Sequence, residues 1–454
     1  MPVPELQEPE LPHSMPGGEG AQLQQFPFRA GGRRGLRGEL EVFLACSRSM
    51  RILLVANMIY ALVLPVIEIF IAAYVMRNSH EVSKVVTYQL SVYAATPVAF
   101  YLNGLLMGRI AVKHLYGAGM LLSGVAMMML MRTGNLTAVG IVLSGLSMGL
   151  STGMFWANRG FLALATTDDG NRNYFYGVEM FAGTLTAVLV PASIGWIIAG
   201  TARFGWFGGV PNHAYRVIAA VVFALTILSA GLVQRGRFRN PSHTRFVFFR
   251  FQPVWYRMLE LALLKGLASG YILTVPAMLI MLLVGKEGTL GATQAVGGVL
   301  SACLLYGIGR ATAPRHRLAV LSVGVILFFV GAAASSLLFN TAGVFIFMGC
   351  LMIAKPLLDL AYNPIELQVV DTVARIEGRS EYAYFLNHEF GLFAGRFLGC
   401  VLFLAVARWG SGVVALKYAL PFIAMLQMLS IPVGKKILRD IGMMSEARSE
   451  KLDR

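Results

Sequence analysis

Four ionisable residues lie inside stretches of sequence that are otherwise almost entirely apolar. The clearest is Glu68, in the run VLPVIEIFIAAYV, which contains no second charged residue that could pair with it. Burial favours the neutral form of a carboxyl group, so this side chain could load and release a proton. The alternative is a structural carboxyl group that hydrogen-bonds to a neighbouring element.

The other three residues are Lys265, Lys355 and Asp359. Lys355 and Asp359 are four residues apart and would share one face of a helix. They would either neutralise each other or present a zwitterionic patch to a polar solute. Lys265 is deep enough in its apolar run to meet a solute, although a lysine there can also extend its ammonium group to the surface.

The elements that position these residues are predicted to be transmembrane helices. Hydrophobic residues make up 56% of the 454-residue chain and charged residues only 13%, whereas a soluble domain carries roughly 25% charged residues. Apolar runs of about 20 residues span a bilayer core. We therefore predict an all-α polytopic membrane protein with about twelve spans, at residues 52–76, 87–108, 115–131, 136–160, 174–200, 214–234, 258–285, 289–309, 318–339, 342–366, 382–407 and 413–434.

The distribution of positive charge predicts the topology. Of the 38 Lys and Arg residues, 27 fall on the side of the two termini, 8 on the opposite side and three inside the spans, namely Lys265, Lys355 and Arg396. Cytoplasmic segments carry the excess of positive charge. We therefore expect a multi-pass protein of the cytoplasmic (inner) membrane with both termini in the cytoplasm.

A net charge of +15 could also indicate a nucleic-acid partner. The basic residues occur in short segments between apolar runs, and no DNA-binding or RNA-binding signature is present, so we expect no nucleic-acid partner. Membrane lipids are the expected partner of the basic, aromatic segment 235–257. The four cysteines have no paired spacing and no set of metal ligands is evident, so we expect no metal and no cofactor.

Five regions follow from this pattern. They are a disordered or amphipathic cytoplasmic tail (1–50), an N-terminal six-helix half (51–234), a basic linker (235–257), a C-terminal six-helix half (258–438) and a cytoplasmic tail (439–454).

The two halves contain matching residues in the same order, which indicates an internal repeat. Gly108-Arg109 follows the second span, and Gly309-Arg310 follows the eighth. The fifth and eleventh spans begin with the same Tyr-Phe pair followed four residues later by a glutamate, Glu179 in one and Glu389 in the other. Asn158 in the fourth span likewise matches Asn363 in the tenth.

Twelve spans in a six-plus-six repeat, together with the stretch from Asn103 to Arg109 and with Lys113, resemble the major facilitator superfamily of secondary transporters. The acidic residue usual before the arginine is absent, since Met107 and Gly108 stand there. Gly183, Pro191 and Gly195 resemble part of the Gly-Pro motif of antiporters in that superfamily. The resemblance implies two six-helix halves and alternating access, and it covers residues 50–440.

The resemblance also implies a central cavity lined by the first, fourth, seventh and tenth spans, which carry Glu68, Lys265, Lys355 and Asp359. It places the second span beside the eleventh and the fifth beside the eighth. We therefore predict two ion pairs, Arg109 with Glu389 and Arg310 with Glu179, that hold the halves together on the cytoplasmic side in the outward-open state. The alternative for the two glutamates is a favourable position near a helix N-terminus.

These patterns predict a secondary transporter of a small organic solute, with protons as the expected coupling ion through Glu68. Efflux or flipping of amphiphiles and lipids remains an alternative. A transporter-like sensor or assembly factor is an alternative of another class. An intramembrane enzyme would need a polar catalytic cluster at matched depth, which we do not find, so we expect no enzymatic activity.

Overall fold

The structure is a computed structural model that describes residues 36–452, apart from 133–135, 168–170, 239, 241–247, 249, 286, 312–313 and 380. Met1–Cys46 and Ser47–Arg454 are separate compact units. In the first unit, helix α1 (Leu36–Ala45) lies within the tail of residues 1–50 that the sequence predicts to be disordered or amphipathic.

The second unit is built from helices, and its described residues contain no strand. Its first half consists of α2 (Arg48–Ala61), η1 (Val66–Phe70), α3 (Ile71–Ser79), α4 (Val82–Leu106), α5 (Val112–Arg132), α6 (Ala138–Thr166), α7 (Arg172–Phe204), η2 (Trp206–Gly209) and α8 (Pro211–Gln234). Its second half consists of α9 (Pro253–Leu283), α10 (Glu287–Ala311), η3 (Pro314–His316), α11 (Arg317–Leu338), α12 (Thr341–Glu377), α13 (Glu381–Trp409), α14 (Gly412–Gln427) and α15 (Ser430–Leu452).

Eleven of the described helical segments are long and apolar enough to cross a membrane, with α2 to α3 and α14 to α15 each counted as one segment. Helix α4, of 25 residues, occupies the position of the predicted second span but is not among these eleven segments. Its polar residues have a structural reason, because Tyr88, Gln89, Tyr93 and Thr96 line a cavity rather than face lipid. The structure thus confirms an all-α polytopic membrane protein.

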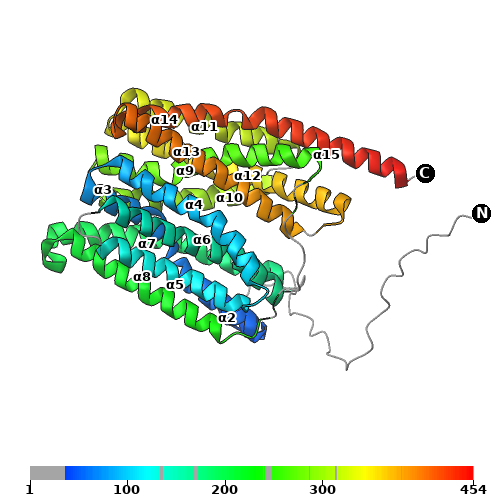
Figure 1. Ribbon diagram of the computed structural model, residues 1–454, viewed down its shortest axis with the longest axis horizontal. Helices are drawn as coiled ribbons and strands as arrows, with labels where there is room; N and C mark the ends of the chain where they lie inside the picture. The colour runs from blue at the N-terminus through cyan, green and yellow to red at the C-terminus, as the bar shows by residue number, and fades with distance from the viewer. Residues whose placement is uncertain are drawn as a thin grey trace, which may run out of the picture. The chain divides into compact units, whose positions relative to one another are not determined.

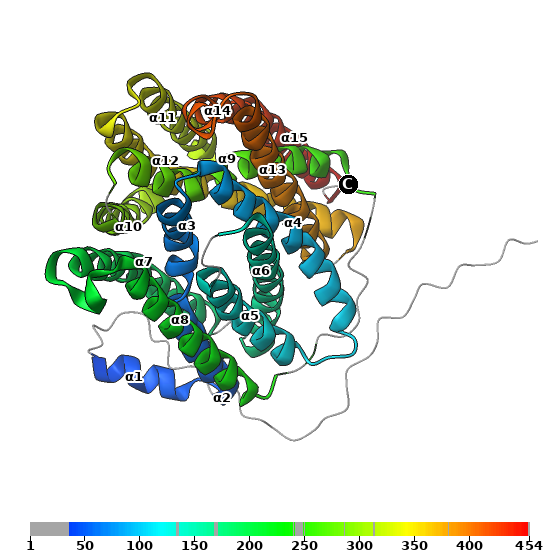
Figure 2. The same cartoon turned by 60° about the vertical axis from the view of Figure 1, so that its left-hand side comes forward.

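The helices form two groups, α2–α8 and α9–α15, which lie side by side in both views (Figures 1 and 2). We call the end where α2 begins and α15 ends the proximal end, and the end where α3 meets α4 the distal end. The groups contact each other where α7 packs on α10, where α4 packs on α13 and where α3 packs on α9.

Small residues bring α7 and α10 together in the distal part of the bundle. A Cβ atom added to Gly291 would lie 2.3 Å from the carbonyl oxygen of Pro191, and one added to Gly195 would lie 2.9 Å from Cα of Gly291. Nearer the proximal end of the same helices, a Cβ atom on Gly183 or Gly307 would meet nothing within 4 Å. Close backbone contact between these two helices is therefore concentrated toward the distal end.

An ion pair joins the two halves at the distal end as well. Arg77, in the last turn of α3, pairs with Glu287 at the start of α10. The Glu287 side chain is buried. We call the α7–α10 glycine packing together with this ion pair the distal contact.

Candidate functional site

A cavity of about 1090 Å³ lies between the two halves, lined by residues of both. Its lining reaches Arg379, in the loop between α12 and α13 at the proximal end, whereas toward the distal end it stops at Tyr88 and Leu273, well inside their helices. Its wall is rich in aromatic residues, which are Tyr60, Tyr88, Tyr93, Phe100, Phe155, Trp156, Phe161, Tyr176, Phe385 and Phe393.

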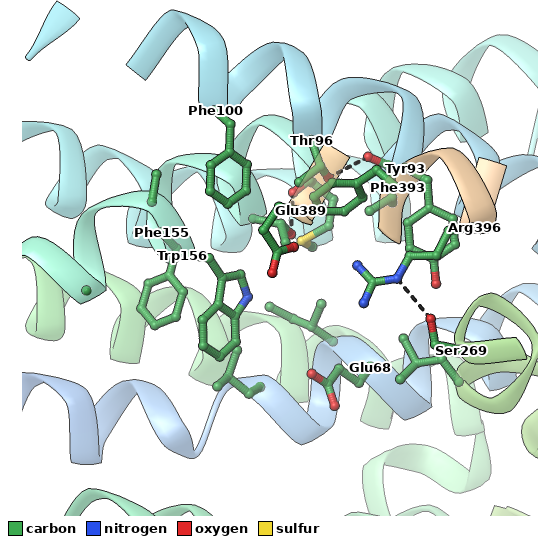
Figure 3. Close-up of a pocket in the computed structure, with 18 of the residues that line it drawn as sticks. Glu68, Tyr93, Thr96, Phe100, Phe155, Trp156, Ser269, Glu389, Phe393 and Arg396 are labelled. Atoms are coloured by element: carbon green, nitrogen blue, oxygen red, sulfur yellow. Dashed lines mark hydrogen bonds between the residues drawn. The ribbon is translucent and has the colours of Figure 1, made fainter. Parts of the chain in front are cut away.

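Two carboxylates and one guanidinium group from the membrane-spanning helices face this cavity. Figure 3 shows Glu68, Glu389 and Arg396 directed toward a common space, with Phe155 and Trp156 on the side opposite Arg396. Within the described part of the chain, no ion pair includes any of the three. The cavity therefore presents both signs of charge without internal neutralisation by direct contact.

Glu68 faces the cavity from a part of the first span that is not a regular α-helix. Helix α2 ends at Ala61, and the chain passes Pro65 before it resumes as the π-helical turn η1. Proline lacks the N–H group that an α-helix needs, and single π-helical turns are frequent at functional sites. The Glu68 side chain is exposed to the cavity, and Lys355 and Arg396 lie close enough to act on it electrostatically.

Arg396 is held in place by one hydrogen bond and two aromatic rings. Its Nε donates to Ser269 Oγ at 3.1 Å, and its guanidinium carbon lies 5.5 Å from the ring centre of Tyr93 and 5.0 Å from that of Phe393. These contacts come from α9, α4 and α13, so both halves position the guanidinium group. Its two terminal nitrogens make no hydrogen bond within the described part of the chain.

The other predicted candidates lie in an adjoining pocket of about 70 Å³ inside the C-terminal half. Lys265, Lys355 and Asp359 line it, and Ser269 lines both this pocket and the cavity. Within the described part of the chain, Lys355 and Asp359 form no ion pair with each other. Asp359 instead pairs at 3.4 Å with Lys265, which reaches it from α9.

A hydrogen-bonded chain connects α12 to α13 beside this pocket. Glu366 binds His388 Nδ1 at 3.1 Å, and His388 Nε2 lies 2.5 Å from the hydroxyl oxygen of Tyr362. The ammonium group of Lys265 lies 3.8 Å from the centre of the Tyr362 ring and 3.3 Å from the amide oxygen of Asn363. His388 and Tyr362 are buried, so the chain satisfies groups that would otherwise be costly at this depth.

The predicted latch residues are not brought together in this structure. Glu179 is bound by Arg159, whose Nε and Nη2 donate to it at 3.0 and 2.6 Å, and by the side-chain amide of Asn57 at 2.8 Å. Arg109 is exposed at the proximal end of α4, while Glu389 lines the cavity. The side chain of Arg310 lies outside the described residues.

The latch was predicted for one conformational state. The latch applies to the outward-open state, in which the halves meet at the cytoplasmic side, whereas here the α7–α10 contact lies toward the distal end. The latch therefore stays a prediction. Its two glutamates differ in this structure, because among the described residues only Glu179 has a cationic partner in its own half.

Sequence reasoning identified Glu68 but missed Arg396 and the cavity position of Glu389. The signal for Arg396 was available, since it is one of three cations inside the predicted spans. The aromatic wall was not recognisable, because an aromatic residue in a membrane helix can equally face lipid or a neighbouring helix.

Comparisons with known proteins agree with this architecture. No protein-family model matches the chain. The chain is 22% identical over 376 residues to the uncharacterized protein YqgE of Bacillus subtilis (strain 168), with 79% of this chain and 83% of that protein covered. The crystal structure of the nucleoside transporter NupG superposes with a TM-score of 0.63 and 11% sequence identity, covering 86% of this chain and 99% of that one. The chain therefore has the fold of a solved membrane transporter.

Proposed function

We propose that this protein is a secondary transporter of the major facilitator type, which moves a small polar organic solute across the cytoplasmic membrane by alternating access. The observation that carries this proposal is the charged cavity between two six-helix halves, accompanied by a distal contact on one side of it. A volume of about 1090 Å³ is ample for a small organic solute. The fold shared with NupG supports the same function.

The end of the bundle that the cavity reaches supports a state that is open to the cytoplasm. The lining extends to the proximal end, where α2 begins and α15 ends, and the segments predicted on the side of the termini carry 27 of the 38 Lys and Arg residues. Cytoplasmic segments carry such an excess. Alternation would then break the distal contact and bring the proximal ends of the two halves together, where the latch residues lie.

Glu68 is the proposed proton site. It is a carboxyl group at the middle of a span, it faces the cavity, and its π-helical turn sets it apart from the regular helix. A carboxyl group that alternates between two aqueous sides can carry a proton with each cycle. Substrate and proton would thus meet in one cavity.

The test begins with a ligand screen of the purified protein by thermal shift at pH 6 and pH 8. Nucleosides are the first class to include because of the fold shared with NupG, followed by amino acids, sugars, organic acids and amphiphiles. A ligand that binds only the folded state must raise the melting temperature. Hits are then assayed for uptake into proteoliposomes with and without an imposed pH gradient.

We expect Glu68→Gln to abolish the stimulation of uptake by the pH gradient while ligand exchange at equal pH persists. Glu260→Gln is the matched control, because Glu260 is an exposed carboxylate on α9 outside the cavity lining. Gradient-driven uptake that survives in Glu68→Gln would remove Glu68 as the proton site. Failure of every compound class to bind or move would contradict the transporter proposal and favour a sensor or assembly role.

A second candidate, export or flipping of amphiphiles, is favoured by the aromatic wall around Phe100, Phe155 and Trp156. Lipid analogues in the same proteoliposomes test it. Scrambling or directional movement of a fluorescent lipid, without any polar ligand in the thermal-shift screen, would support this candidate over the first.

A further inference from the structure

We infer that the solute is amphoteric, with a carboxylate that binds Arg396 and a cationic amine that lies between Glu68 and Glu389. This inference deepens the proposed transport function and rests on it. It identifies a substrate class from the charges of the cavity wall.

The carboxylate end follows from the state of Arg396. An arginine side chain stays protonated in proteins, so it cannot escape the cost of a low-dielectric site by losing its charge. Ser269 uses only its Nε, and no carboxylate of the described chain pairs with the guanidinium group. The two terminal nitrogens therefore remain as a planar fork, which is the geometry that binds a carboxylate through two parallel hydrogen bonds.

The amine end follows from the two carboxylates that face the same space (Figure 3). Glu68 and Glu389 have no hydrogen bond and no ion pair among the described residues, although each interacts electrostatically with Arg396 at longer range. A carboxyl group at this depth is either protonated or accompanied by a cation. An ammonium group of the solute would supply that cation, and it would compete with a proton for the same oxygens.

The charges around the cavity argue against two other classes of solute, phosphate monoesters and purely cationic compounds. Lys265 forms an ion pair with Asp359, and Arg379 at the rim of the cavity pairs with Glu377 at 2.7 Å. Lys355 acts on Glu68 from the adjoining pocket but does not line the cavity. A phosphate monoester carries a charge of about −1.5 to −2 near neutral pH, which a lone guanidinium group beside two carboxylates would not balance. A purely cationic solute would leave Arg396 without a partner.

The wall opposite Arg396 suits an apolar or aromatic part of the solute. Phe155 and Trp156 lie there, and the Trp156 side chain is partly exposed. Aromatic rings provide apolar area and can also stabilise a cationic group that lies over their faces. Aromatic amino acids and short peptides combine a carboxylate, an ammonium group and an apolar side chain in one molecule.

The experiment compares matched ligands on the purified full-length protein. The probes are the α-amino acids and a set of dipeptides, each beside its C-terminal amide, which lacks the carboxylate, and its N-acetyl form, which lacks the ammonium group. Binding is measured by thermal shift and calorimetric titration on the wild type, Arg396→Gln, Arg396→Lys and Arg408→Gln. Arg408 is the control, because it lies exposed in the last turn of the same helix, outside the cavity lining.

We expect at least one amphoteric compound to bind the wild type roughly ten- to a hundredfold more tightly than its amide, because one charge-assisted contact is lost. Arg396→Gln should weaken the amphoteric form by a similar factor and leave the amide unchanged, so that the preference disappears. Arg396→Lys should recover part of it, and Arg408→Gln should behave as the wild type. Melting temperatures without ligand separate loss of binding from loss of folding.

The inference is overturned if no amphoteric compound binds the wild type, or if the preference for the carboxylate survives in Arg396→Gln. A neutral or purely cationic compound that is transported would overturn the inference while the transporter proposal stands. Absence of binding and transport for every class would contradict both.

Discussion

Replacement of Gly291 by alanine should shift the protein away from the state described here. Its added Cβ atom would lie 2.3 Å from the Pro191 carbonyl oxygen, whereas ordinary contact begins near 3.4 Å, so α7 and α10 must separate by about 1 Å. Overpacking of this kind costs roughly 1–3 kcal/mol. The cost falls only on the state in which the distal contact is closed, so the closed population should fall about 5- to 150-fold relative to the open one.

The assay is a spin-label distance measurement across the distal end, in a protein without its four cysteines. Labels at Val210 in the first half and at Leu337 in the second are suitable, because both side chains are exposed. Gly307→Ala is the control on the same helix: its Cβ atom would meet nothing within 4 Å, and it shares the gain in helix propensity that alanine brings. Gly291→Ala should add a population of longer distances that Gly307→Ala lacks.

The reasoning fails if Gly291→Ala gives the same distance distribution as the wild type. A lower melting temperature with unchanged distances would also refute it, since the glycines would then stabilise the fold without controlling the distal contact.

Three further perturbations have defined outcomes. Glu287→Gln removes the charge that pairs with Arg77, and it should lengthen the same distal distances to a smaller extent than Gly291→Ala. Arg159→Met leaves the Glu179 carboxylate without its cation and should cost roughly 1–3 kcal/mol, seen as a lower melting temperature that Glu179→Gln partly restores in the double variant. His388→Phe removes a buried hydrogen-bond partner and should lower the free energy of unfolding by a similar amount, seen as a lower melting temperature. An unchanged melting temperature would show that the hydrogen bonds of His388 contribute nothing to stability.

The fold class was predictable because a bilayer imposes a simple length and composition rule on each span. The ends of the helices were not predictable, since hydropathy does not show how far a helix continues beyond its apolar part. Helix α12 runs to Glu377 although the predicted span ends at residue 366, and α15 runs to Leu452 although the last predicted span ends at 434. The interruption of the first span at Pro65 was also missed, because its residues are as apolar as a regular helix.

The candidate site was predictable only in part, for a related physical reason. A charge in an apolar run is conspicuous, so Glu68, Lys265, Lys355 and Asp359 were found, and all four line the cavity or its adjoining pocket. When a helix is apolar on all sides, its hydropathy does not predict which face meets the cavity. The partners of each charge therefore had to come from the structure, and Asp359 proved to pair across helices rather than along its own.

A difference between the matching segments of the two halves explains why the charges that face the cavity are distributed unevenly. Glu179 and Glu389 occupy matching positions, but the arginine that neutralises Glu179 follows Asn158, whereas proline follows the matching Asn363. The second half therefore lacks an arginine at the equivalent position, and its glutamate faces the cavity together with Arg396. Among the described residues of the first half, only Glu68 provides a charge to the cavity.

This asymmetry bears on how a bound solute could drive alternation. A ligand favours one conformation only if it binds that conformation more tightly. An amphoteric solute that spans Glu68 in the first half and Arg396 in the second would bind most tightly when both halves close around it. Closure at the proximal end would shorten both contacts at once, and the binding energy gained there would offset the loss of the distal glycine packing and of the Arg77–Glu287 pair.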